Sequence, residues 1–137
     1  MSSCITLGNR GIQAQIQGGQ ITMQQYKPSF TNPSILTSTD KTVTLKQNEI
    51  ESLRQHLVEI NTAIKDFAER QVSPNIFHPL GDGGIHVFVT VFKGHLLVHL
   101  RQYTRSYVAP TTVYPSKKGI CLKMDEWNEL HELLKAM

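Results

Sequence analysis

A hairpin-like stretch, VFKGHLLVHLRQY at residues 91–103, concentrates side chains that can contact a polyanion. Its apolar and polar residues alternate on both sides of a Lys-Gly turn, which predicts two antiparallel strands. With the residues just before it, one face of these strands carries His86, Phe88, Thr90, Phe92, His95, Leu97, His99, Arg101 and Tyr103. Because no acid lies among them, this face can attract phosphate, and its aromatic rings can stack on nucleic acid bases.

Charge is distributed unevenly along the 137-residue chain, whose net charge is +3 and whose sequence pI is about 9.0. Residues 84–123 contain six lysines and arginines and no acid, whereas the next nine positions contain four acids. Acids near the start of a helix also complement the positive end of its dipole, so their position has a local explanation. The positive net charge of the chain permits a polyanionic partner without requiring one.

The sequence around these residues predicts strands followed by helices. Residues 45–70 and 124–137 repeat apolar side chains at helical spacing and are each expected to form one helix. Strands are expected at residues 85–92 and 95–101, and further ones around residues 111–114 and 118–122. Residues 71–84 contain two prolines and three glycines and are expected to be a connector.

The composition is that of an ordinary globular domain, with 39% hydrophobic and 18% charged residues. Cys4 and Cys121 lie far apart without a metal-binding spacing and are expected to be free thiols. The sequence shows neither a secretion signal nor an apolar run long enough to span a membrane, so secretion and membrane insertion are not expected.

The chain contains an internal repeat. IQAQIQGGQITMQQY aligns with HVFVTVFKGHLLVHLR at an offset of 75, which pairs Gly19 with Gly94. KTVTLKQNEIESLRQHL aligns with KGICLKMDEWNELHELL at an offset of 77, which pairs Ile50 with Trp127. The two offsets differ by only two residues, so the alignment holds through a hairpin, a strand and a helix. It predicts two ββββα units, at residues 1–72 and 73–137.

A unit of this size buries too little apolar surface to be secure alone. We therefore expect an α+β fold in which two units, each a curved antiparallel sheet followed by a helix, pack as an intramolecular pseudo-dimer. Further self-association of the chain stays open.

The second unit resembles the positive cofactor four family of transcriptional coactivators. The resemblance covers roughly residues 85–134 and rests on VFKGHLLVHLRQY followed by PSKKGICLKMDEWNEL. It implies a curved antiparallel sheet that binds single-stranded DNA or melted duplex. The resemblance and the face described above together give the expected nucleic-acid-binding residues: Phe88, Phe92, Lys93, His95, His99, Arg101, Tyr103, Lys117 and Lys118.

The first unit is expected to be a structural half. Its matching face carries Gln13, Gln15, Gln17, Gln20, Thr22, Gln24 and Tyr26, and Asp40-Lys41 stands where the second unit has Lys117-Lys118. Amides and hydroxyls keep a sheet soluble but offer little charge for phosphate. A weak contribution from the glutamines, which can hydrogen-bond bases, stays open.

Other functional classes fit less well. The sequence shows no nucleophile-base pair with an orienting acid, no phosphate-cradling glycine loop and no paired catalytic carboxylates, so no enzyme is expected. His95 and His99 share a face but have no acidic or cysteine ligand beside them, so neither a metal nor a cofactor is expected.

The sequence thus predicts a non-enzymatic single-stranded DNA-binding protein of transcription coactivator type, acting in transcription, replication or repair. It is expected to be nuclear in a eukaryote or in a virus of eukaryotes, and cytoplasmic otherwise. One alternative is a protein-protein adaptor whose main partners are transcription proteins and for which nucleic-acid binding is secondary. The other is an RNA-binding module, since stacking and phosphate contacts do not read the sugar.

Overall fold

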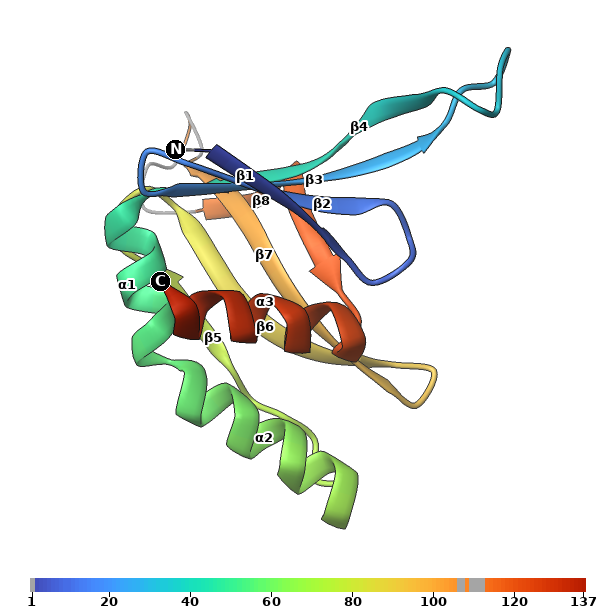
Figure 1. Ribbon diagram of the computed structural model, residues 1–137. Coiled ribbons are helices and arrows are strands. Elements are labelled where there is room, and N and C mark those ends of the chain that lie inside the picture. The colour runs from blue at the N-terminus through green and yellow to red at the C-terminus, as the bar shows by residue number, and fades with distance from the viewer. Residues whose placement is uncertain (1, 106–107, 109–112) are drawn as a thin grey trace.

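The computed structural model describes residues 2–105, 108 and 113–137, which form two four-stranded antiparallel sheets with helices (Figure 1). The first sheet has the order β1-β2-β3-β4 and the second has the order β5-β6-β7-β8, so each is a simple meander. The α+β class is therefore confirmed, with four strands ahead of a helix in each half.

The elements of the first half are β1 (Ser2–Leu7), β2 (Ile12–Gln17), β3 (Gln20–Pro28), β4 (Leu36–Leu45), α1 (Gln47–Gln55) and α2 (Leu57–Arg70). The expected single helix over residues 45–70 is thus two helices. His56 separates them, with φ −98° and ψ 0°, and both its flanking segments keep an apolar face. Helical spacing of apolar residues continues across such a break, which is why the pattern alone did not reveal it.

The elements of the second half are β5 (Phe77–Leu80), β6 (Ile85–Phe92), β7 (His95–Arg105), β8 (Val113–Leu122) and α3 (Met124–Ala136). The expected connector at residues 71–84 is wrong in its last part, because it contains β5. Pro79 is tolerated there because β5 is an edge strand of the sheet. The two strands expected around residues 111–114 and 118–122 are one strand, β8, although residues 111 and 112 lie outside the described residues.

The two sheets share their pairing register, which defines how the halves correspond. The β3–β4 ladder has a bulge after Gln24 and the β7–β8 ladder has one after Arg101, so β3, β4 and α1 match β7, β8 and α3 at an offset of 77. Leu7 pairs with Ile12 and Leu80 pairs with Ile85, so β1 and β2 match β5 and β6 at an offset of 73.

The expected offset of 75 for the hairpin is therefore wrong, whereas 77 for the last strand and helix is confirmed. The pair Thr90–Leu97 matches the pair Gln17–Gln20, and the β6–β7 hairpin then continues for two more residue pairs before its turn. An offset of 75 aligns the turns instead of the ladders. Because side chains alternate with a period of two, an error of two residues leaves each side chain on its expected face.

One hydrophobic core draws on both halves. Strand residues that alternate with the exposed face enter it, for example Ile21 and Met23 in β3 and Val98 and Leu100 in β7. Trp127 of α3 is fully buried there and donates a hydrogen bond from Nε1 to Asn61 Oδ1 of α2 at 3.1 Å.

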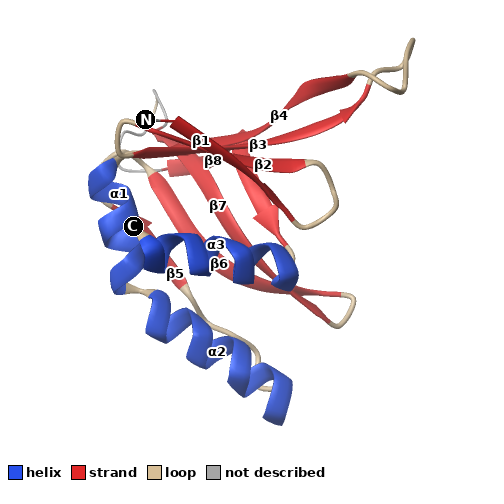
Figure 2. Cartoon of the chain, in the orientation of Figure 1, coloured by secondary structure: helices blue, strands red, loops and turns tan. Residues whose placement is uncertain are grey.

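Each helix that follows a sheet also contacts the other half. α3 packs against β1 of the first sheet, and α1 packs against β5 of the second. Figure 2 shows the β3–β4 hairpin projecting as an arm away from the helices. Among the described residues, no helix has both the length and the apolar composition that a membrane span needs.

Candidate nucleic-acid interface

Five rings from three neighbouring strands of the second sheet form an aromatic cluster: Phe77, His86, Phe88, His99 and Tyr103. Phe88 stacks on His99 with ring centroids 4.5 Å apart and an interplanar angle of 6°. Tyr103 contacts His86 at 4.6 Å and meets Phe77 edge-on at 5.7 Å. The cluster is a half-exposed aromatic surface on a sheet face, the kind of surface on which nucleic acid bases stack.

Strand pairing brings these rings together. Phe88 lies opposite Phe77 of β5 on one side and opposite His99 of β7 on the other. His86 lies opposite Arg101, which places a guanidinium beside the cluster. Directly opposed side chains on one face of an antiparallel sheet are close enough to touch, so local alternation and register suffice to build the cluster.

His99 is the most constrained member of the cluster. Its Nε2 shares a hydrogen bond with Thr90 Oγ1 at 2.7 Å, while its Nδ1 is buried and has no hydrogen-bond partner among the described residues. Burial, with a smaller effect from the nearby Arg101 charge, holds the pKa of His99 below its ordinary value. The ring is therefore neutral at neutral pH and presents itself to a ligand as a stacking surface rather than a cation.

The lowered pKa of His99 predicts a pH-dependent stability. In the unfolded chain the imidazole binds a proton near pH 6.5, and in the folded chain only at lower pH, so stability should fall as the pH is lowered through about 6.5. Urea unfolding midpoints at about pH 8 and pH 5.5 measure this. His99→Gln should show a smaller fall than the wild-type protein, and an equal fall would contradict the assignment.

The tip of the β6–β7 hairpin carries a second group of predicted residues. Phe92 is 61% exposed, and Lys93 Nζ lies 5.4 Å from the centroid of its ring. Lys93 has a positive φ of 53° and Gly94 one of 80°, the left-handed pair that a tight two-residue hairpin turn requires. The ring and the cation are thus held at an exposed turn.

A hollow of about 570 Å³ lies beside this tip. It is lined by Phe92, Lys93, His95, Leu96, Leu97, Arg10, Cys121, Lys123, Met124 and Asp125. The hollow therefore has an aromatic and apolar wall, and its lining also includes basic groups and one acid, Asp125. Burial raises the pKa of the Cys121 thiol, so that side chain is a neutral part of the wall.

The remaining predicted basic residues lie nearer the first sheet. Arg101 donates a hydrogen bond from Nη1 to Ser116 O at 2.9 Å, which fixes its guanidinium beside the start of the Lys117-Lys118 pair. Both lysines are exposed and line a hollow with Asp40 and Thr42 of β4. The structure thus gathers Phe88, His99 and Tyr103 in one cluster, puts Phe92, Lys93 and His95 at the hairpin tip, and leaves Lys117 and Lys118 at the β4 side.

Three residues of this face were missed or undervalued by the sequence reasoning. Phe77 was missed because it lies in the expected connector. The motif Leu80-Gly81-x-x-Gly84 repeats Leu7-Gly8-x-x-Gly11, and this repeat could have indicated a strand ending at Leu80. His86 was placed on the face but not among the binding residues. Lys123 lines the hollow at the hairpin tip and was not considered.

The matching face of the first sheet is held by its own polar groups. Gln24, at the position of Arg101, donates from Nε2 to Thr39 O at 2.8 Å, and Thr22 and Thr44 share a hydrogen bond at 3.0 Å. Gln15 stands at the position of Phe88. No aromatic cluster is found on this face among the described residues.

A further cluster of titratable residues joins the helix break to β5. His78 Nε2 lies 2.7 Å from Glu59 Oε1, and the rings of His56 and His78 stack at 4.2 Å with an interplanar angle of 5°. The hydrogen bond from His78 lowers the pKa of Glu59. Because an imidazole binds a metal in its own plane, two parallel rings this far apart cannot both direct a nitrogen at one ion, and the cluster is explained as a stack with a hydrogen bond.

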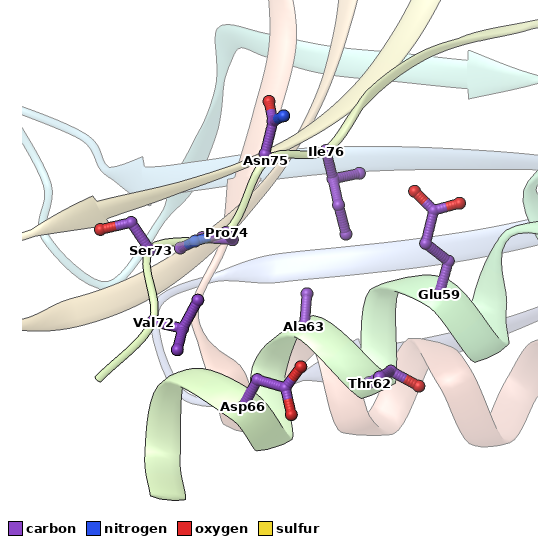
Figure 3. A pocket seen from close by; sticks show the side chains of 9 residues that line it. All are labelled: Glu59, Thr62, Ala63, Asp66, Val72, Ser73, Pro74, Asn75 and Ile76. Carbon is purple, nitrogen blue, oxygen red and sulfur yellow. The ribbon is translucent and has the colours of Figure 1, made fainter. Parts of the chain in front are cut away.

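A hollow of about 340 Å³ lies between α2 and residues 72–76 (Figure 3). Figure 3 shows two carboxylates, Glu59 and Asp66, on the α2 side of this hollow. Carboxylates repel phosphate, so this hollow does not extend the basic and aromatic surface.

Comparison with known families gives one match in the second half. Residues 82–133 match the family model described as Transcriptional Coactivator p15 (PC4). The match covers β6, β7, β8 and most of α3, which are the elements that carry the predicted binding residues. Curated proteins and solved structures give no significant match.

Proposed function

We propose that this protein binds single-stranded DNA without catalysing a reaction, as a coactivator-type protein of transcription, replication or repair. The observation that carries the proposal is the aromatic cluster on an acid-free sheet face, next to Arg101. The match of residues 82–133 to the PC4 coactivator model supports it independently. Single-stranded DNA, or the strands of a melted duplex, is the ligand whose unstacked bases can reach such a surface.

In this proposal the residues divide by chemistry. Bases stack on Phe88 and Tyr103 in the cluster and on Phe92 at the hairpin tip, and His99 is a neutral ring stacked against Phe88. The phosphates contact the basic side chains along the face, which are Lys93, Arg101, Lys117 and Lys118. His95, exposed at the hairpin tip, can hydrogen-bond a base or a phosphate.

We further propose that residues 1–72 and 73–137 act as the two halves of an intramolecular pseudo-dimer. The reciprocal packing of α3 on β1 and of α1 on β5 supports this arrangement. In it, the first half completes the core and supplies no nucleic-acid channel of its own. A nuclear location in a eukaryotic host follows from the proposed role.

The proposal predicts strong salt dependence and a preference for single strands. If the four basic residues each neutralise one phosphate, log affinity plotted against log salt concentration should have a slope of roughly −3, at about 0.7 per contact. Fluorescence anisotropy with a labelled oligonucleotide measures it, and the matching duplex and RNA are the comparisons. Duplex affinity equal to single-strand affinity would contradict base stacking, and tighter RNA binding would favour the RNA-binding alternative.

The adaptor alternative has one observation in its favour. The tip of the β3–β4 arm exposes apolar side chains, with Phe30 fully exposed and Ile35 and Leu36 each 53% exposed. An exposed apolar tip suits a protein contact. Absence of any binding to single strands at about 50 mM salt would move the function to this alternative, since electrostatic contacts are strongest at low salt.

A further inference from the structure

The two halves contain corresponding buried glutamates, and among the described residues only Glu126 has a cationic partner. Glu126, at the start of α3, is fully buried and accepts a hydrogen bond from the backbone N–H of Lys123 at 2.8 Å. Glu49, at the start of α1, is 3% exposed and accepts one from the backbone N–H of Lys46, also at 2.8 Å. The two carboxylates are equivalent by the offset of 77.

Arg10 from the β1–β2 turn occupies the space in front of Glu126. Its Nε donates to Glu126 Oε2 at 2.8 Å and its Nη2 donates to Glu126 Oε1 at 2.6 Å, so the ion pair is bidentate. Nη2 also donates to Cys121 O at 2.9 Å. The hydrogen bonds to the carboxylate raise the pKa of Arg10. The space is thus shaped for a guanidinium.

At the corresponding place in the other half, the arginine is missing. The β5–β6 turn matches the β1–β2 turn at an offset of 73, which puts Gly83 at the position of Arg10. A Cβ at Gly83 would lie 2.8 Å from Glu49 Oε2, so the glycine is next to the carboxylate. Within the described part of the chain, no donor is hydrogen-bonded to that Oε2.

A hollow of about 310 Å³ opens where the arginine would be. It is lined by Thr42, Val43, Thr44, Lys46, Glu49, Gly83, Ile85, Gln102 and Lys118. Thr44, whose carbonyl corresponds to the Cys121 acceptor of Arg10, is among them. The hollow therefore keeps the carboxylate and the carbonyl acceptor of the filled site and has no arginine in its lining.

We propose that this hollow, which we call the Glu49 hollow, binds the guanidinium of an arginine side chain presented by another polypeptide. A guanidinium fits better than an ammonium because its planar fork can bond both carboxylate oxygens at once, as Arg10 does at Glu126. The inference depends on the correspondence of the two halves and not on nucleic-acid binding.

The other charged groups lining the hollow, Lys46 and Lys118, oppose a cation and should make the binding weak. The site at Glu126 binds Arg10 despite the same repulsion, because it has equivalent lysines: Lys123 corresponds to Lys46, and Lys41 corresponds to Lys118. It differs in having Asp125 near Arg10, where the Glu49 side has Asn48. We therefore expect a dissociation constant on the order of 1 mM for an isolated arginine side chain.

The test is an NMR titration of the full chain with N-acetyl-L-arginine amide, followed through backbone amide shifts. The amide of Lys46, which donates to Glu49, and that of Gly83 should shift and saturate. N-acetyl-L-lysine amide should shift them at least about fivefold less at equal concentration, because an ammonium cannot bond both oxygens. Equal shifts from the two compounds, or shifts spread without saturation over surface acids, would overturn the proposal.

Two variants localise the effect. Glu49→Gln keeps an acceptor for the Lys46 N–H and removes the charge, so it should keep the fold and lose the saturable shifts. Gly83→Arg should fill the hollow from within and also lose them. Saturable shifts that persist in folded Glu49→Gln would refute the site.

Discussion

Replacing Arg10 with alanine should destabilise the protein by about 3–5 kcal/mol, because it leaves a buried carboxylate without its cation. Glu126 is fully buried, and the side chain of Arg10 is 29% exposed, so water compensates the charge poorly. The same arginine links the β1–β2 turn to α3, two elements from different halves. The loss should therefore appear in the free energy of unfolding of the whole chain.

Urea unfolding measures the loss. With a slope of about 2 kcal/mol per M, the midpoint should fall by roughly 1.5–2.5 M. Arg54→Ala is the matched control, because Arg54 is half-buried and pairs with the exposed Glu51 at 3.8 Å (i,i+3), and the loss of this pair should cost no more than about 0.5 kcal/mol. Equal losses in the two variants would mean that the pair between Arg10 and Glu126 does not join the halves.

Adding Glu126→Gln to Arg10→Ala should recover part of the stability. Glutamine keeps an acceptor for the Lys123 N–H while removing the stranded charge, so the double variant separates the charge effect from the helix cap. A double variant less stable than Arg10→Ala would show that the carboxylate itself, rather than its pairing, holds this region.

Single-strand binding should depend on the second sheet and not on the first. Phe88→Ala should weaken binding by about 1–3 kcal/mol through lost stacking and leave the salt slope nearly unchanged. Arg101→Ala should reduce the magnitude of that slope by about 0.7, the value of one phosphate contact. The structurally matched changes in the first sheet, Gln15→Ala and Gln24→Ala, should alter neither quantity much.

Fluorescence anisotropy at several salt concentrations with one short oligonucleotide compares all four variants. Their urea midpoints must also be measured, because Phe88 stacks on His99 and its loss can disturb the sheet. Phe92→Ala supplies a cleaner stacking test, since Phe92 is 61% exposed and its hairpin extension has no counterpart in the first half. Equal binding losses in both halves would mean that both sheets bind.

Much of the architecture was predictable from alternation and repetition. The strands at residues 85–92 and 95–101, the helix at 124–137 and the offset of 77 for the last strand and helix are all found. Strand β5 was missed because prolines and glycines surround its four residues, and single-sequence patterns cannot distinguish a short edge strand from a loop. The break at His56 was missed because the apolar face continues through it.

The candidate binding face was also predictable only in part. The residues that lie on it could be predicted, because a strand's side chains alternate and an error of two residues in register does not change the face. The contacts could not be predicted. Phe77 joins the aromatic cluster only through the pairing of β5 with β6, and the pKa of His99 is lowered mainly because the packed sheet buries its ring.

The order of strands and helices, the faces of the strands and the concentration of aromatic and basic residues in the second half all follow from the sequence, because each depends on local periodicity and composition. The pairing of Arg10 with Glu126, and the open hollow in front of Glu49, follow instead from the three-dimensional packing. Local patterns do not reveal such a pairing because Arg10 and Glu126 are far apart along the chain. Those partners lie 116 residues apart, and a contact across such a separation exists only once both sheets and both helices are in place.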